Sequence, residues 1–391
     1  MTVGGLRWAA GGFVVSFAVH AQDFDACVKE LRTQASAGGI SATVIDNAFT
    51  NLQPDPSVIE ASENQPEFET PVWDYIARLV DDKRIADGRE MLEQWRKPLG
   101  LAQRRYGVDR NFLVAVWGVE TDYGRIMGKR SLVRSLATLS CSGPRQSYFR
   151  GELMAALGIL QAGDVRADSL RGSWAGAFGH AQFMPSTFRK SAVDLDGDGK
   201  RDIVGSIPDA LGSIAKYLKD SGWVSGEPWG YEVSVPKNYA GPLGRRNRHE
   251  LAEWTKLGIR RTGGKPLTGP DRAALIMPAG VRGPAFLVFA NFDAIHAYNN
   301  STSYALAIAH LADRLQGGGP FVTAWPTDER MLSRPERIEL QLWLTERGFY
   351  SGVADGILGS RTSEAIRAFQ VSSGMAPDGF ATFRLLAALR Q

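Results

Sequence analysis

Histidine and cysteine are scarce in this chain of 391 residues, which contains five histidines and two cysteines. The histidines form no HExxH pair, which argues against a zinc protease, and no serine stands in the GxSxG setting of a serine hydrolase. The chain also has no large excess of one charge, because it contains 45 basic and 42 acidic residues. The formal net charge of +3 argues against a dedicated nucleic-acid binder and is compatible with loose attraction to an anionic polymer.

What is present is an ordinary globular composition, 44% hydrophobic and 22% charged, in a chain long enough for two or three domains. The N-terminus differs from the rest. Arg7 is followed by an apolar run over residues 8–19 and by a small residue, Ala21. This pattern predicts a secretory signal peptide over residues 1–21, since a membrane-spanning helix needs about 20 apolar residues. A buried first helix is the alternative.

Export would place the protein in the periplasm. We expect no lipid anchor, because the residues before Cys27 (Phe-Asp-Ala) are not the small apolar setting of a lipid-modified cysteine. In an oxidising compartment Cys27 could pair with Cys141. Two separate buried thiols are the alternative, since the sequence does not give the distance that a disulfide requires.

Apolar residues recur at helical spacing through much of residues 24–218, including a stretch over 89–106. Residues 229–295 differ, because they are rich in glycine and proline and hold short β-like runs. A helix over residues 303–315 follows, and Gly317 opens a stretch that reads as a linker. We therefore predict a mainly α (α+β) protein with these parts: signal peptide 1–21, a domain over 22–316 with a small strand-containing subdomain, linker 317–334, and a three-helix module over 335–391.

The segment 109–124 (DRNFLVAVWGVETDYG) has an unusual glutamate. Asp109 is a good N-cap residue, and three large apolar residues share one face of the expected helix with Glu120, namely Leu113, Val116 and Trp117. Burial among apolar groups raises the pKa of a carboxyl, and a protonated carboxyl is what a glycosidase needs to protonate its leaving oxygen. The alternative is a glutamate that reaches solvent or pairs with an arginine such as Arg125.

A second catalytic carboxylate is not evident, although ordinary glycoside hydrolysis uses two. Asp122 is the nearest candidate. Two residues along a helix correspond to a turn of about 200°, so its side chain points away from Glu120. We expect Asp122 to be solvated.

Three blocks carry a resemblance to a known family: GVETDYG at 118–124, GSWAGAFGHAQFMPS at 172–186, and AYNNSTSY at 297–304. In this order they resemble the membrane-bound lytic transglycosylase B family, whose catalytic core is goose-lysozyme-like, over roughly residues 24–316. The resemblance implies that Glu120 is the catalytic acid and base. It also implies a set of residues that line the sugar cleft: Ser173, Gln182, Tyr298, Asn299 and Tyr304.

The resemblance further implies cleavage of the MurNAc-β-1,4-GlcNAc bond of peptidoglycan without water, giving 1,6-anhydroMurNAc ends. The C6 hydroxyl of the substrate is the nucleophile, and an intramolecular nucleophile gains from proximity. One carboxyl can then serve as acid and base in turn. Glycan strands are the expected partner, with cell-wall synthesis or division proteins as further candidates and no organic cofactor. A hydrolytic muramidase and a non-catalytic peptidoglycan-binding scaffold are the alternatives.

An acidic loop begins at Asp194 and matches the opening of a calcium loop, with Gly199 at the sharp turn. The glutamate expected at position twelve is replaced by Gly205. Some family members resemble this arrangement with a later aspartate that closes the loop. The candidate set for a structural calcium is Asp194, Asp196, Asp198, Lys200 and Asp209. The alternative is a solvated acidic turn with Lys200 and Arg201 as counter-charges.

The C-terminal residues 336–391 resemble the peptidoglycan-binding domain type 1 family. Two Asp-Gly turns, at Asp355 and Asp378, and the pairs at 340–341 and 369–370 carry the resemblance. It implies a three-helix module that binds the cell wall and raises the effective concentration of substrate. A module that only stabilises the chain is the alternative.

Overall fold

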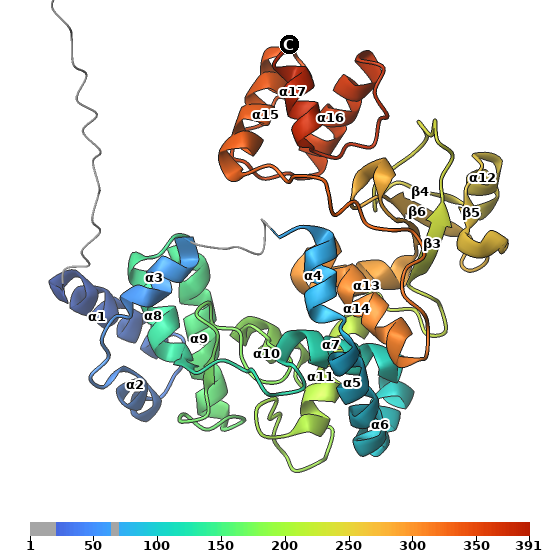
Figure 1. Cartoon of the computed structure of the whole chain (residues 1–391). Coiled ribbons are helices and arrows are strands. Elements are labelled where there is room, and N and C mark those ends of the chain that lie inside the picture. The colour runs from blue at the N-terminus through green and yellow to red at the C-terminus, as the bar shows by residue number, and fades with distance from the viewer. Residues whose placement is uncertain (1–20, 64–69) are drawn as a thin grey trace, which may run out of the picture.

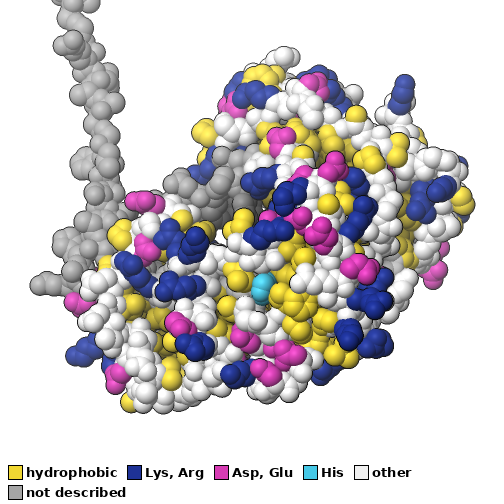
Figure 2. Space-filling view, turned by 60° about the horizontal axis from the view of Figure 1, so that its bottom comes forward, with side chains coloured by type: hydrophobic (Ala, Val, Ile, Leu, Met, Phe, Trp, Pro, Cys, Tyr) yellow, Lys and Arg dark blue, Asp and Glu magenta, His cyan; other side chains and the backbone are white. Residues whose placement is uncertain are grey.

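A computed structural model describes residues 21–63 and 70–391 of the chain (Figure 1). The expected signal peptide lies outside these residues, apart from Ala21. Within the described part of the chain, no helix has the length and apolar character needed to cross a membrane. Figure 2 shows that basic and acidic side chains are interspersed over one face, in keeping with the nearly balanced charge.

The main body is helical, and most of it shares one hydrophobic core. Its helices are α1 (Ala21–Ala37), α2 (Ala42–Phe49), α3 (Pro56–Glu63), α4 (Val72–Leu79), α5 (Asp82–Gln94), α6 (Arg96–Tyr106), α7 (Arg110–Thr121), α8 (Leu132–Ser142), α9 (Gln146–Ala162), α10 (Pro185–Ser191), α11 (Ile207–Asp220), α13 (Ala290–Asn299) and α14 (Thr302–Leu315). Helices α1, α2, α3, α8 and α9 form one end of this body, and α4 to α7 lie with α11 and α14 at the other (Figure 1).

Residues 89–106 do not form one helix. Helices α5 and α6 meet at Trp95, which has non-helical backbone angles and caps both. Pro98 explains the break, because proline lacks an N–H and its ring clashes with the carbonyl four residues earlier. That carbonyl belongs to Gln94, the last residue of α5. Helix α6 therefore starts in a new direction.

The end of the body formed by α1 and α8 is cross-linked. Cys27 of α1 and Cys141 of α8 form a disulfide, with their Cα atoms 5.9 Å apart. The two cysteines are separated by 114 residues in the sequence. Of the two alternatives that the sequence left open, the structure has the paired one.

The strand-containing subdomain is confirmed as an antiparallel sheet with the strand order β4-β6-β7-β3-β5. Its elements are β3 (Gly230–Ser234), β4 (Arg248–Glu250), α12 (Leu251–Lys256), β5 (Arg260–Arg261), a 3₁₀ turn at Thr262–Gly264, β6 (Arg272–Ile276), a second at Gly280–Arg282, and β7 (Ala285–Val288). Phe286 and Val288 face the main core, whereas Leu287 faces a separate small core. Because successive side chains of a strand point to opposite faces, the two faces of the sheet pack against two different cores. A second antiparallel sheet consists of two short strands, β1 (Arg130–Ser131) and β2 (Arg171–Gly172), and β1 directly precedes α8.

The C-terminal module has its own apolar core, which includes Leu340, Ile366 and Leu385. Its helices are α15 (Arg334–Glu346), α16 (Ser360–Ser372) and α17 (Phe383–Leu389). Ser333 and Glu336 form a capping box at the start of α15, which stabilises the first turn.

The segment 317–334 has no helix or strand before Arg334, yet it is packed against the body. The buried carboxylate of Glu232 accepts hydrogen bonds from the amides of Val322 (2.6 Å) and Thr323 (2.7 Å). Phe321 stacks on His310 with ring centroids 4.0 Å apart. Further along, Arg282 forms ion pairs with Asp328 (2.7 Å) and Glu329 (2.9 Å).

The module also touches the sheet subdomain directly. Asp378 accepts a hydrogen bond from the amide of Val281 (3.0 Å), and Arg367 donates to the carbonyl of Gly241 (2.8 Å). The module is therefore held both through the segment before it and through its own surface.

Candidate active site

Glu120 lies in the last turn of α7 and is half-buried. Asp109 caps the start of this helix by accepting a hydrogen bond from the amide of Asn111 (2.8 Å), as its position predicts. The helix ends in three consecutive left-handed residues: Asp122 (φ 50°), Tyr123 (φ 58°) and Gly124 (φ 89°). At Gly124 a Cβ atom would lie 2.3 Å from the ring of His180, so both the angle and the space favour glycine.

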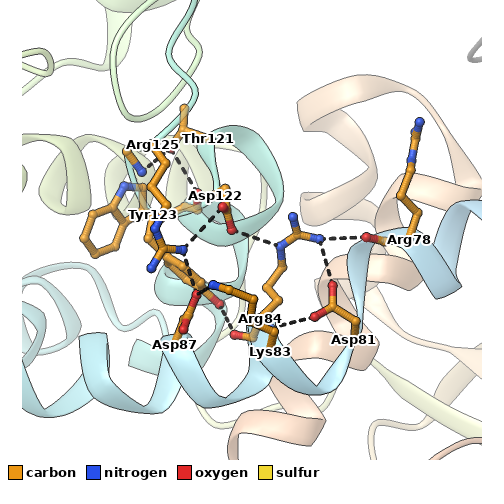
Figure 3. A network of polar contacts seen from close by, with 11 residues as sticks. Arg78, Asp81, Lys83, Arg84, Asp87, Thr121, Asp122, Tyr123 and Arg125 are labelled. Atoms are coloured by element: carbon orange, nitrogen blue, oxygen red, sulfur yellow. Dashed lines mark hydrogen bonds and ion pairs between the residues drawn. The ribbon is translucent and has the colours of Figure 1, made fainter.

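A network of charged residues fixes this turn against α5 (Figure 3). Asp122 forms ion pairs with Arg84 (3.5 Å) and Arg125 (3.3 Å), and Arg125 also pairs with Asp87 (2.7 Å). Tyr123 donates to the carbonyl of Arg84 (2.8 Å). The expectation that Asp122 is simply solvated is therefore wrong, because two arginines on neighbouring segments neutralise it. Arg125, offered as a partner for Glu120, is instead engaged by two aspartates.

The second of the three sequence blocks, residues 172–186, contacts α7 through His180. The indole N–H of Trp117 donates to Nδ1 of His180 (3.0 Å), and Thr121 donates to the His180 carbonyl (3.3 Å). Burial lowers the pKa of His180, which favours the neutral ring that can accept this bond. Two residues later, the side-chain amide of Gln182 donates to the carbonyl of Met127 (3.2 Å), just beyond the α7 turn.

The third block reaches Glu120 directly. Tyr304, in the first turn of α14 and 2% exposed, donates a short hydrogen bond to Oε1 of Glu120. Tyr298 donates to the carbonyl of Ala181 (2.7 Å), beside Gln182, and its ring stacks on that of Tyr304 with centroids 6.1 Å apart. Burial, reinforced by the charge of Glu120, raises the pKa of both tyrosines, so both stay protonated donors.

The remaining candidate cleft residues lie at the edges of these blocks. The hydroxyl of Ser173 accepts a hydrogen bond from the amide of Ala177 (3.1 Å), which closes the loop after β2. Asn299 is exposed at the end of α13.

Two supporting residues gave no signal in the sequence. Tyr217 of α11 donates to the carbonyl of Ala297 (2.8 Å) and packs edge-on against Tyr298. Glu152 of α9 is 3% exposed and accepts hydrogen bonds from the amide (2.9 Å) and hydroxyl (2.6 Å) of Ser186. Glu152 is thus occupied in capping α10, and its role is structural.

The acidic loop gathers four carboxylates. Oxygen atoms of Asp194, Asp196, Asp198 and Asp209 all lie within 4.8 Å of one another. Asp209, in the first turn of α11, is fully buried and accepts hydrogen bonds from the amides of Leu195 (2.8 Å) and Asp202 (2.8 Å). Burial raises the pKa of Asp209, whereas hydrogen bonds from the loop amides lower the pKa of Asp194.

The basic residues of this loop do not neutralise it. Arg201 turns away to form an ion pair with Asp164 (2.6 Å). Lys200 is exposed, and its amide donates to Asp198 (2.8 Å). An ammonium group is not a metal ligand, so Lys200 could contribute only through its carbonyl. The loop therefore fits a hard cation that takes oxygen ligands.

Comparison with known proteins identifies the family. A family model described as a transglycosylase SLT domain matches residues 23–313. The chain belongs to this family. A second model, described as a peptidoglycan binding domain, matches residues 333–389.

Solved structures and a curated relative agree with this assignment. SltB3 from Pseudomonas aeruginosa, solved with NAG-anhNAM-pentapeptide, has a TM-score of 0.92 and 48% identity, covering 95% of this chain and 100% of that one. The Escherichia coli lytic transglycosylase Slt35, solved with calcium, has a TM-score of 0.66 and 28% identity, covering 76% of this chain and 93% of that one.

The membrane-bound lytic murein transglycosylase B of Escherichia coli (strain K12) is 36% identical over 244 residues, which is 61% of this chain and 65% of that relative. The match thus spans slightly less than two thirds of the curated relative. The family and the mainly α, lysozyme-like fold expected from the sequence are confirmed.

Proposed function

We propose that this protein is a lytic transglycosylase that cleaves the MurNAc-β-1,4-GlcNAc bond of peptidoglycan and forms 1,6-anhydroMurNAc ends. The observation that carries the proposal is the convergence of the three blocks on Glu120. Tyr304 contacts the carboxylate itself. Tyr298 donates a hydrogen bond to the second block, and His180 of that block accepts one from Trp117 on the helix of Glu120. Membership of the SLT family supports the same reaction.

The reaction needs one carboxyl group. Protonated Glu120 gives its proton to the glycosidic oxygen as the bond from that oxygen to C1 breaks. The resulting carboxylate then takes the proton of the substrate's C6 hydroxyl as O6 bonds to C1, so water does not enter. Tyr304 holds Oε1 and fixes the orientation of the carboxyl throughout. Ser173, Gln182 and Asn299 are proposed to contact the sugars.

The test compares a Glu120→Gln variant with a control, Glu90→Gln, which changes an exposed glutamate of α5. Purified peptidoglycan is digested, and the products are identified by mass spectrometry. The wild type and Glu90→Gln should release anhydro ends, whereas Glu120→Gln should release none but still bind the glycan. Reducing ends from the wild type would indicate a hydrolytic muramidase. Normal turnover by Glu120→Gln would refute the assignment.

We further propose that the acidic loop binds a structural calcium through Asp194, Asp196, Asp198 and Asp209, with the carbonyl of Lys200 as an additional ligand. The four gathered carboxylates support this, and a related structure, Slt35, was solved with calcium. The ion would contribute to stability and not to the chemistry.

Calcium should raise the melting temperature of the wild type and give heat in calorimetry. Asp198→Asn should abolish both effects. Asp25→Asn, which changes an exposed aspartate of α1, should leave both effects intact. No heat and no thermal shift in the wild type would contradict the proposed site.

We infer a periplasmic location, reached through cleavage of the predicted signal peptide. The disulfide between Cys27 and Cys141 supports an oxidising compartment. Sequencing the N-terminus of the protein recovered from cells should give Gln22 as the first residue; a chain that retains residues 1–21 would contradict this. Glycan strands are the proposed partner of the C-terminal module, and cell-wall synthesis or division proteins are further candidates.

A further inference from the structure

A cavity of about 1180 Å³ opens at the other end of α7 from Glu120. Asp109, the N-cap of α7, lies in its wall, and eleven residues of helix, roughly 16 Å, separate it from Glu120. The other walls come from residues 223–232, β5, the end of α14 and residues 317–322. Glu120 does not line this space, so the cavity is separate from the proposed catalytic centre.

The aromatic residues around the cavity do not offer it a stacking surface. Phe112, Trp223, Trp229 and Tyr231 are between 3% and 7% exposed. Phe321 is covered by His310 and by Phe286, whose ring centroid is 4.8 Å away. Sugars in proteins commonly rest on exposed aromatic faces, so this cavity is poorly suited to a glycan.

Charged side chains of both signs line the cavity instead. Arg261 lies over the Tyr231 ring at 4.5 Å and, within the described chain, forms no ion pair. Glu227 is half-buried and likewise forms no ion pair with any described residue. Asp313 accepts a hydrogen bond from the indole of Trp229 (3.0 Å). Burial raises the pKa of Asp313 to about 6, because the Trp229 hydrogen bond and the charge of Arg261 offset the burial only in part, and Asp313 forms no ion pair with any described residue.

We propose that this cavity binds a short zwitterionic peptide, with Arg261 receiving its carboxylate and Asp313 and Glu227 receiving its ammonium group. Half-buried charges that face the same space and lack ion-pair partners gain most from a ligand that supplies the opposite charges. The volume exceeds the usual range for small ligands, about 300–1000 Å³, so several amino-acid residues fit. The occupant we infer is a free stem peptide of peptidoglycan, and this choice of peptide rests on the proposed function.

Calorimetry on the full chain with a pentapeptide stem freed of its sugars tests the proposal. The wild type should bind the peptide, and Arg261→Gln should weaken binding at least tenfold. Arg105→Gln, which changes an exposed arginine of α6 outside the cavity wall, should bind as the wild type does. The same peptide with its N-terminus acetylated and its carboxylates amidated should not bind.

Two further measurements separate peptide binding in this cavity from catalysis and from a loss of folding. Glu120→Gln should bind the free peptide normally, so failure of the catalytic assignment would not affect the result. Glu227→Gln, with its melting temperature recorded, replaces Arg261→Gln if the latter fails to fold. Absence of heat with millimolar peptide, equal binding of the blocked peptide, or unchanged binding by both charge variants would overturn the proposal.

Discussion

Replacing Tyr304 with phenylalanine isolates the contact that positions Glu120. The ring would stay in place, because it is 2% exposed and stacks on Tyr298. Only the hydroxyl that donates to Oε1 of Glu120 is lost. Glu120 becomes charged as it gives up its proton, and a hydrogen bond to a charged group contributes about 1.5–3 kcal/mol. Loss of this bond in the transition state corresponds to a fall in kcat of roughly 10- to 150-fold.

The assay is the loss of turbidity of purified sacculi, with anhydro products counted by mass spectrometry. Tyr239→Phe is a matched control, because this tyrosine is also buried and its hydroxyl donates to a backbone carbonyl, that of Pro242, in the sheet subdomain. The control should keep its rate within about threefold. A Tyr304→Phe variant as fast as the wild type, or slowed only as much as Tyr239→Phe, would show that the hydroxyl does not position Glu120.

Three stability predictions accompany it. Replacing Cys27 and Cys141 by serine should lower the free energy of unfolding by about 2–5 kcal/mol in urea titrations, because the disulfide closes a long loop; an unchanged midpoint would contradict this. Leu113→Ala should cost about 2–5 kcal/mol, since Leu113 is fully buried on α7, and Leu101→Ala, at an exposed position of α6, should cost far less. The pKa of Asp313 is raised from 3.8 to about 6, so its contribution to stability is fully present below pH 3.8 and lost as the pH rises through 6. Asp313→Asn should therefore be more stable than the wild type at pH 8 and nearly equal at pH 4 in thermal melts; the reverse order would show that the carboxylate is well compensated.

Local patterns predicted helix α7 well. The N-cap at Asp109 and the apolar face shared by Leu113 and Trp117 follow from side-chain spacing, and both are present. The sheet subdomain could also be predicted, because short apolar runs within a segment rich in glycine and proline mark strands such as β7. The break at Trp95 could have been found from Pro98, three residues further on.

Contacts between segments that are distant in the sequence could not be predicted from local patterns. Asp122 looked solvated because helix periodicity describes only its own helix, whereas its partner Arg84 arrives on α5. The hydrogen bond between Tyr304 and Glu120 joins residues 184 positions apart. The side chain of Arg201 forms an ion pair with Asp164 and not with the acidic loop, and no spacing rule connects these two residues. The sequence patterns identified these side chains but not their partners.

The two attachments of the C-terminal module bear on how a wall polymer would be cut. Glu232 secures Val322 and Thr323 at one end of the intervening segment, and Asp378 secures the module at the other. A piece of chain fastened at both ends cannot swing freely, so the module does not search space as a loosely tethered anchor would. If the module binds a glycan strand and Glu120 cleaves it, as proposed above, these contacts would keep the two sites at a fixed distance from each other.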